Sequence, residues 1–345
     1  MSEKSFSFTV VIPVYKVEKY IRETIESVTA QSIGFEDNIE IILVNDGSPD
    51  SSGDICLEYR DRYPENIIYI EKENGGVSSA RNAAIPYIRG KYVNFLDSDD
   101  CWSETAFENV LRLFGEHYDE TDVVGCRKEF FGAKTGFHYL DYKFESTRII
   151  DLRKEPDCIQ LDVTGAFIKA EAIGERRFSE KLKFGEDAQF VTSILLEKCC
   201  LGVCREAVHK YRKRTDGSSA LQNDVKDPGY YTASPEYFLQ QLLDESVSKY
   251  GTAEKFIQFT VMYELGWRIR KKDVRQYLDD DEYESYCDKL TSILKQIDDS
   301  VIKQQRNLWK KHKLFCLMKK HGMDGAAKLF ADMSGLETVY NIRKN

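Results

Sequence analysis

The first 117 residues alternate between two hydrophobic periods, and this alternation constrains the fold more than any other feature of the sequence. Runs rich in β-branched residues predict strands at 8–14, 39–45, 67–71 and 91–96, and apolar residues at helical spacing predict helices between them. The last of these helices is expected to begin with Ser103 as its N-cap. Strand–helix alternation predicts parallel βαβ units in an α/β sheet, whose ligands bind at the carboxyl ends of the strands.

Two changes of pattern further along the chain indicate domain boundaries. Mixed strand and helix patterns continue to about residue 214, where a stretch rich in Gly, Ser, Asp and Pro begins. Beyond residue 235 the pattern is helical, with few β-branched runs. We therefore expect an α/β domain over residues 1–220, a linker over 221–234 and a smaller, mainly helical domain over 235–345.

The composition argues against several classes of protein. With 49 basic and 58 acidic residues the chain has a net charge of −9, and 42% of its residues are hydrophobic. This balance argues against a disordered chain and against a polybasic nucleic-acid binder. The sequence has neither an apolar run that could span a bilayer nor a signal-peptide core near its start, so we expect a cytoplasmic chain. Its nine cysteines include no CxxC pair and are expected to be reduced thiols.

The segment Asp97-Ser98-Asp99-Asp100 directly follows the fourth predicted strand and carries the strongest chemical signal. Three carboxylates on a short turn repel one another unless a cation or a proton offsets their charge. Oxygen ligands at a strand end suit a hard divalent cation such as Mg²⁺ or Mn²⁺, which often also holds a diphosphate. A capped turn at the start of the next helix is the alternative interpretation of the same residues.

Two further loops follow predicted strands and could approach a nucleotide. The first contains Asp46, whose carboxylate can accept hydrogen bonds from a base or ribose, followed by Gly47. The second has Gly75 and Gly76 at the start of a helix, where an anion is favoured, with Arg81 in the next turn. Taken alone, each loop is explained equally well as an ordinary turn.

Together, the four fragments VVIPVYKVEKYI, ILVNDGSPDSS, NGGVSSARN and YVNFLDSDD are far more specific than any one of them. In this order they resemble the family 2 glycosyltransferases, and in particular those that build bacterial surface polysaccharides. The resemblance covers about residues 5–219. It implies the GT-A fold, a Rossmann-like domain of nucleotide-diphospho-sugar transferases, followed here by the helical C-terminal domain.

The resemblance implies a donor site at the strand ends. Asp46 is expected to read the edge of the nucleobase, Arg81 to lie near the base and diphosphate, and Asp99 to bind the Mn²⁺ or Mg²⁺ that bridges the diphosphate. Asp97 is expected on the ribose side, next to Ser98. The residues expected around the nucleobase are Pro13, Val14, Tyr15 and Glu18.

The acceptor side of the site is implied by residues later in the chain. Glu186-Asp187 resembles the family's acidic pair at a helix start, in which the second acid, Asp187, is the catalytic base. Glu186 is expected to orient the acceptor, and Gly165 to keep the acceptor wall open. A single base without a covalent intermediate implies inversion at the anomeric carbon. Taken alone, the pair is better explained as charges at a helix N-terminus.

Residues 209–219 resemble the family's closing loop, in which basic side chains and hydroxyls contact the diphosphate. Arg212, Arg214 and Ser218 are the candidates for this contact. Some relatives place a metal-binding histidine near this loop, so His209 is either such a ligand or, as we expect, a structural residue on the preceding strand.

The activity implied is transfer of one sugar from a nucleoside-diphosphate donor, most commonly a UDP-sugar, to a hydroxyl of a surface glycan. Capsule, exopolysaccharide, lipopolysaccharide and teichoic acid are compatible acceptors, free or lipid-linked. Two alternatives remain open. One is another nucleotide-dependent transfer that releases pyrophosphate, and the other is a degenerate family member that acts as a scaffold or partner subunit.

The C-terminal part contains a basic stretch at 303–320 without an acidic residue. We expect it to pack on the helical domain, with Asp279–Glu284 offsetting its charge. The alternatives are contact with an anionic membrane leaflet on the inner face of the cell membrane and binding of an anionic polymer acceptor. The helical part could also form an oligomer. The residues predicted to share one face of its helix are Leu308, Trp309, His312, Phe315 and Met318.

Overall fold

The computed structural model describes residues 5–214, 226–271 and 274–331 and divides the chain into two compact units. The first unit comprises Met1–Asp151, Gln160–Glu180 and Glu186–Gln222. The second comprises Leu152–Ile159, Lys181–Gly185 and Asn223–Asn345. The second unit thus includes two short segments from within the range 1–220, which the sequence pattern assigns to the α/β domain.

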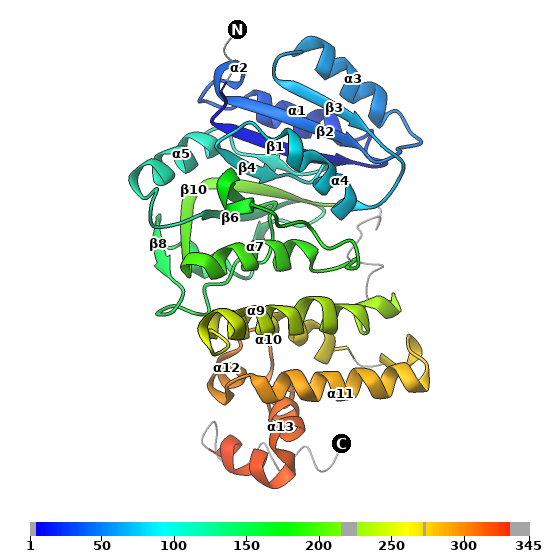
Figure 1. Ribbon diagram of the computed structural model, residues 1–345, viewed down its shortest axis with the longest axis vertical. Helices are drawn as coiled ribbons and strands as arrows, with labels where there is room; N and C mark the ends of the chain where they lie inside the picture. The colour runs from blue at the N-terminus through cyan, green and yellow to red at the C-terminus, as the bar shows by residue number, and fades with distance from the viewer. Residues whose placement is uncertain (1–4, 215–225, 272–273, 332–345) are drawn as a thin grey trace. The chain divides into compact units, whose positions relative to one another are not determined.

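The first unit is built on a sheet whose described strands run in the order β3-β2-β1-β4-β9-β6-β10-β5 (Figure 1). Strands β1 to β4 are mutually parallel, as the sequence predicts, whereas β9 is antiparallel to both β4 and β6. Two short strands lie off this path, because β7 pairs with β6 and β8 pairs with β10. The strands are β1 (Phe8–Val14), β2 (Ile39–Asn45), β3 (Ile67–Glu71), β4 (Tyr92–Phe95), β5 (Cys101–Trp102), β6 (Val123–Gly132), β7 (Gly136–Phe137), β8 (Arg148–Asp151), β9 (Ala166–Lys169) and β10 (Cys200–Lys213).

Helices of the first unit pack against the sheet. Alternate residues Phe8, Val10 and Ile12 of β1 share one hydrophobic core with Ile25 and Phe107 on neighbouring helices, as the period of two in a strand requires. Helix α4 packs against β1 and β2, and α7 against β6. The helices are α1 (Ile21–Thr29), α2 (Phe35–Asn38), α3 (Ser52–Arg62), α4 (Val77–Ala84), α5 (Ala106–Glu116), α6 (Ala170–Ile173) and α7 (Glu186–Lys198), with 3-10 turns at Ile85–Tyr87 and Asp141–Phe144.

The start of α5 differs from the sequence prediction, because Ser103 is not its N-cap. The short strand β5 precedes the helix and pairs antiparallel with β10. Ser103 extends this contact, since its backbone N–H donates to the carbonyl of Val208 at 2.9 Å and its hydroxyl accepts from the Val208 N–H at 3.1 Å. The helix begins only at Ala106. The turn at residues 97–100 is therefore held between two strands, β4 and β5.

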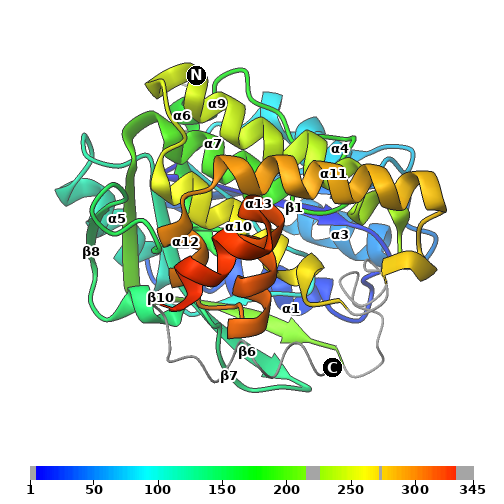
Figure 2. The ribbon, with the colours of Figure 1, turned by 90° about the horizontal axis from the view of Figure 1, so that it is seen from below.

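The second unit is helical, and its helices pack on one another around their apolar faces. Helix α10 packs on α9 and α12, and α13 packs on α11 and α12 (Figure 2). Asp279 begins α11 with a capping box, and α13 is kinked at Gly322, where φ is +75°. The elements are α9 (Gln241–Tyr250), α10 (Lys255–Ile269), α11 (Asp280–Gln296), α12 (Asp299–Gln304) and α13 (Lys310–Ala331), with a π-helical segment at Pro235–Gln240 and 3-10 turns at Pro228–Tyr230 and Val274–Gln276.

Two sequence predictions concern the chain as a whole. All nine cysteines are free thiols, and all but Cys200 and Cys287 are buried. Among the described residues, no helix is both long enough and apolar enough to cross a membrane.

Candidate active site

The turn at residues 97–100 lies where β4 ends, and basic side chains offset its carboxylates. The Asp97 carboxylate accepts a hydrogen bond from the Arg81 guanidinium at 3.1 Å, and Asp99 accepts one from Arg214 Nε at 2.7 Å. Burial and the neighbouring Asp100 raise the pKa of Asp99, and the Arg214 charge opposes that rise. The turn thus carries clustered negative charge that needs cations, as the sequence predicts.

Asp100 points away from solvent and faces β10. Its Oδ1 accepts from the backbone N–H of Arg212 at 2.8 Å, and its Oδ2 lies 3.0 Å from His209 Nε2. The latter two atoms are at ion-pair distance but lack the alignment of a hydrogen bond. His209 is completely buried, and its ring packs against Trp102 with the centroids 5.2 Å apart. The Arg212 N–H therefore anchors β10 to the turn through Asp100, with the His209 ring packed beside it.

Arg212 and Arg214, the predicted diphosphate-binding residues, both fold onto the acidic turn. Arg212 Nε donates to the Asp99 carbonyl oxygen at 2.7 Å, and a terminal nitrogen donates to Glu23 at 2.5 Å. Arg214 pairs with the Asp99 carboxylate. The third predicted residue of this group, Ser218, lies outside the described residues.

Asp46 lies at the end of β2 and holds the glycine loop that precedes α4. Its carboxylate accepts backbone hydrogen bonds from Gly75 at 3.0 Å and from Gly76 at 2.8 Å, and it forms an ion pair of 2.6 Å with Lys72. Gly76 has φ +86°, which a glycine adopts without strain. Asp46 thus shapes the loop, and its expected contact with a nucleobase edge stays a prediction.

Lys72 is a site residue that the sequence analysis missed. Asn45 at the end of β2 is in register with Glu71 at the end of β3, and the Lys72 N–H donates to the Asn45 carbonyl at 3.0 Å. Parallel register therefore places Lys72 next to Asp46. A cation directly after the third predicted strand was the available signal, because neighbouring parallel strands end at the same edge.

The residues predicted around the nucleobase lie at the end of β1. Pro13 is partly exposed and Val14 is buried, while Tyr15 is exposed with the Lys16 ammonium 5.0 Å from the centre of its ring. Glu18 accepts a hydrogen bond from the Ser51 N–H at 3.1 Å, which ties this end of β1 to the turn after Asp46.

The remaining member of the acidic turn, Ser98, is oriented through its backbone. Its carbonyl accepts a hydrogen bond from the Thr24 hydroxyl at 2.9 Å, which fixes the turn to α1. The Ser98 residue itself is buried.

The predicted catalytic pair Glu186-Asp187 begins α7, where Glu186 is buried and Asp187 is partly buried. Arg81 Nη1 donates to Glu186 at 3.0 Å while Nη2 of the same guanidinium donates to Asp97. Burial and the neighbouring Glu186 raise the pKa of Asp187 well above its usual range, and Arg81 partly offsets this. A carboxyl group with a raised pKa is suited to accept a proton near neutral pH.

The wall near Gly165 is closely packed and polar. The Gly165 N–H donates to the Asp162 carboxylate at 2.7 Å, and a Cβ at this position would lie 3.0 Å from that carboxylate and 3.4 Å from His209 Nδ1. Asp162 also forms an ion pair of 3.1 Å with Lys128. Although burial alone would raise the pKa of Asp162, Lys128 holds it well below its usual range. No local pattern could pair Asp162 with Lys128, because the two residues meet only where β6 lies beside the segment that precedes β9.

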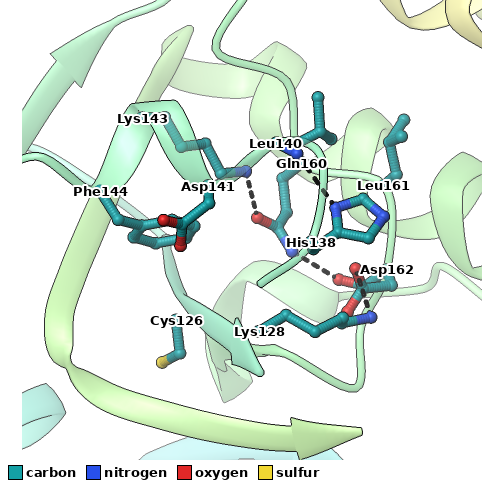
Figure 3. Close-up of a pocket in the computed structure, with 10 residues that line it drawn as sticks. All are labelled: Cys126, Lys128, His138, Leu140, Asp141, Lys143, Phe144, Gln160, Leu161 and Asp162. Carbon is teal, nitrogen blue, oxygen red and sulfur yellow. Dashed lines mark hydrogen bonds and ion pairs between the residues drawn. The ribbon is translucent and has the colours of Figure 1, made fainter. Parts of the chain in front are cut away.

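A small pocket lies beside the Lys128–Asp162 pair (Figure 3). Lys143 Nζ donates to the Gln160 side chain at 2.8 Å within it. Burial and the Lys128 charge lower the pKa of His138 to about 4, so this ring is neutral at pH 7. The pocket is lined by Cys126, Lys128, His138, Leu140, Asp141, Lys143, Phe144, Gln160, Leu161 and Asp162.

The family model for glycosyl transferase family 2 matches residues 9–182, which contain most of these site residues. The chain belongs to glycosyl transferase family 2. It is 43% identical over 325 residues to the minor teichoic acid biosynthesis protein GgaB of Bacillus subtilis strain 168, an alignment that covers 93% of the chain but 36% of GgaB. It is 34% identical over 322 residues to GgaA of the same organism, covering 91% of the chain and 72% of GgaA.

Solved structures resemble this glycosyltransferase over nearly its whole length. Residues 1–349 of TarS from Staphylococcus aureus, in complex with UDP-GlcNAc, match with a TM-score of 0.69 and 18% identity, covering 95% of this chain and 91% of the other. The mannosyltransferase PcManGT from Pyrobaculum calidifontis, in complex with GDP-Man and Mn²⁺, matches with a TM-score of 0.54 and 15% identity, covering 96% and 88%. The predicted fold class, a GT-A domain followed by a helical region, is confirmed.

The acidic turn of this glycosyltransferase offers a divalent cation few protein ligands. The described residues contain no group of three or more His, Cys, Asp or Glu side chains that could hold a metal ion. Asp99 supplies hard carboxylate oxygens, and Arg214 already places a positive charge against them. A donor diphosphate would add further oxygens, so Asp99 fits Mn²⁺ or Mg²⁺ when the nucleotide is bound.

Proposed function

We propose that this chain is an inverting, metal-dependent glycosyltransferase that moves a sugar from a UDP-sugar to a hydroxyl of a bacterial cell-surface glycan. One observation carries the proposal: the Arg81 guanidinium joins Asp97 on the donor turn to Glu186, next to the partly buried Asp187. The predicted donor-binding and base residues are thereby brought into one site. The names of GgaA and GgaB support teichoic acid as the glycan.

The donor nucleotide would lie across the carboxyl ends of β1 and β2. Tyr15 offers an exposed ring on which a base can stack, and Asp46 with Lys72 offers an acceptor and a donor side by side. Such a pair complements the N–H and carbonyl groups of uracil. The TarS complexes with UDP and UDP-GlcNAc support a uridine nucleotide.

The diphosphate would bind at the acidic turn. Asp99 would hold Mn²⁺ or Mg²⁺, and Arg212 and Arg214, which now contact Asp99, would bind phosphate oxygens. The cation, when bound, would stabilise the negative charge that develops on the leaving diphosphate. Asp97 and Ser98 would lie on the ribose side.

Asp187 would act as the base. Its carboxylate would take the proton of the acceptor hydroxyl while that oxygen bonds to the anomeric carbon and the bond from this carbon to the diphosphate breaks. UDP leaves with the bonding electrons, and the configuration at carbon inverts because one displacement occurs. Glu186, fixed by Arg81, would orient the acceptor.

The acceptor and the surroundings complete the proposal. The acceptor would be a glycan, free or lipid-linked. A lipid-linked acceptor would place the enzyme in the cytoplasm, peripherally on the inner face of the cell membrane. An oligomer is compatible with this proposal, and nucleic acid has no part in it.

Nucleotide binding measured by calorimetry tests this function. UDP, GDP, CDP and dTDP would each be titrated with Mn²⁺ and with EDTA, against the parent chain and Asp99→Ala. We expect metal-dependent binding of UDP that is lost in the variant, followed by UDP release from a UDP-sugar when acceptor is supplied. Failure of every diphosphate to bind would overturn the proposal and favour a scaffold.

A further inference from the structure

The helical unit exposes large apolar side chains near the end of α10 and around the start of α13. Trp102 is buried, but the other two tryptophans, Trp267 and Trp309, are 41% and 62% exposed. Phe315 is 39% exposed on α13, whose buried side is formed by Leu314 and Leu317 instead. Helix α13 packs on α11 and α12 as expected, but Trp309 and Phe315 stay outside that packing. Exposed aromatic groups of this size often mark interaction surfaces.

Basic side chains tie the two tryptophans into one surface, and Phe315 lies one helical turn from Lys311 on α13. The Arg270 guanidinium lies 5.0 Å from the ring centre of Trp267 at the end of α10 and 5.7 Å from that of Trp309 before α13. Lys311 Nζ lies 5.3 Å from the Trp309 ring. We call Trp267, Arg270, Trp309, Lys311 and Phe315, with the adjoining exposed Lys310, the tryptophan patch.

The charge of the tryptophan patch is not offset by carboxylates of the described residues. With the described residues, Arg270, Lys310 and Lys311 form no ion pair, in contrast to Lys320, which binds Asp299 at 2.8 Å. Together with burial, the Lys311 and Arg270 charges lower the pKa of His312, as expected beside uncompensated cations.

The acidic block that was expected to offset this charge is engaged elsewhere. Asp279 and Glu282 bond to each other's backbone N–H groups in the capping box of α11. Among the described residues, no ion pair joins Asp279–Glu284 to the tryptophan patch.

The arrangement of the rings indicates which partner fits. A sugar-binding platform needs a free indole face, but the His312 ring is stacked on Trp309 at 5.6 Å and cations lie near the same ring. What remains exposed is an apolar indole surrounded by cations. Trp beside Lys and Arg is the combination found where proteins meet the lipid headgroup region.

We propose that the tryptophan patch binds the surface of an anionic phospholipid bilayer. The indoles and Phe315 would enter the headgroup region, and Arg270, Lys310 and Lys311 would meet lipid phosphates. The residues of the tryptophan patch would make the membrane contact that belongs to the proposed function. It does not depend on the transfer reaction, so either can fail without the other.

Co-sedimentation of the full chain with vesicles tests the proposal. Vesicles of phosphatidylcholine with phosphatidylglycerol are compared with vesicles of phosphatidylcholine alone. Each cation near an anionic surface contributes about fivefold to binding, so Lys310→Gln/Lys311→Gln is expected to weaken partitioning about 25-fold. Trp309→Ser is expected to weaken it as well, and the parent chain's tryptophan emission should shift to the blue on anionic vesicles because Trp102 is already buried.

Matched controls separate this contact from general charge effects and from misfolding. Lys255→Gln/Lys295→Gln removes the same charge from exposed positions of the same unit and should retain parental binding. UDP binding and thermal melting should be unchanged in all of these variants. Equal weakening by both lysine pairs, or no effect of Trp309→Ser together with full competition by soluble polyphosphate, would overturn the proposal. The latter outcome would assign the patch to an anionic polymer.

Discussion

The two acidic groups of the site, the turn at residues 97–100 and the pair at the start of α7, differ in how their charge is balanced. On the turn, Asp97, Asp99 and Asp100 each face a basic side chain. At the pair, Glu186 and Asp187 have one nearby guanidinium, and it is shared with Asp97. Arginines thus pair with Asp97 and Asp99 on the turn, whereas the pair leaves the partly buried Asp187 carboxyl group able to take up a proton.

The largest effect is expected from Asp187→Asn, which removes the proton acceptor but keeps the shape of the side chain. Transfer to the acceptor should fall by roughly 10²- to 10⁴-fold, the usual contribution of a general base. Calorimetric UDP binding should be unchanged, because Asp187 is expected to act on the acceptor hydroxyl and not to contact the nucleotide. Transfer at the parental rate would show that another group takes the proton.

Asp99→Asn tests the turn at residues 97–100 as a cation site and should weaken nucleotide binding. The variant loses the carboxylate that would hold the metal, so affinity for UDP with Mn²⁺ should fall by roughly one to two orders of magnitude. Affinity in EDTA should change little. Asp187→Asn is the matched control. A variant with full Mn²⁺-dependent affinity would place the metal elsewhere.

Arg81→Met removes the cation that links the two groups and is expected to shift a pH profile. Because the Arg81 charge lowers the raised pKa of Asp187, its loss raises that pKa further. The base is then ionised only at higher pH, so the acidic limb of kcat/KM should move to higher pH. The measurement is kcat/KM against pH, with the surface variant Arg22→Met as a control that should leave the limb in place. If the acidic limb does not move in Arg81→Met, the Arg81 charge does not influence ionisation of the base.

The same variant should also lose stability. Glu186 and Asp97 would keep buried or half-buried charge without their partner, at a cost of about 3–5 kcal/mol. Urea unfolding of the parent chain at several pH values tests the raised pKa of Asp187 separately. A raised folded pKa means that the folded state binds more protons, so the Asp187 contribution to stability is present at low pH and is lost as pH rises through that pKa.

The smallest effect is expected from Gly165→Ala, which tests the close packing of Gly165 against Asp162 and His209. The new Cβ would lie 3.0 Å from an Asp162 carboxylate oxygen, and overpacking of this kind costs about 1–3 kcal/mol. Gly115→Ala in α5 is the control, because a Cβ there meets nothing within 4 Å, and it should be neutral or stabilising. Equal melting temperatures for the two variants would contradict the close packing at Gly165.

The local pattern predicted much of the first unit, and its failures have physical causes. Continuous apolar runs placed β1 and β2 within their observed bounds. The start of α5 was misplaced because β5 pairs with β10, more than 100 residues away, and local spacing carries no trace of that pairing. Lys72 was missed because it acquires a role only through the register of β3 against β2.

The family, the parallel strands and the acidic residues at their ends followed from the order of residues alone, because periodicity and short motifs are properties of neighbouring residues. Which charges meet depended on how the chain folds. The fold placed Arg81 between Asp97 and Glu186, set His209 against Asp100, and left Trp309 exposed on a basic surface. Burial and opposing charge act through space, and they depend on contacts that the order of residues along the chain does not contain.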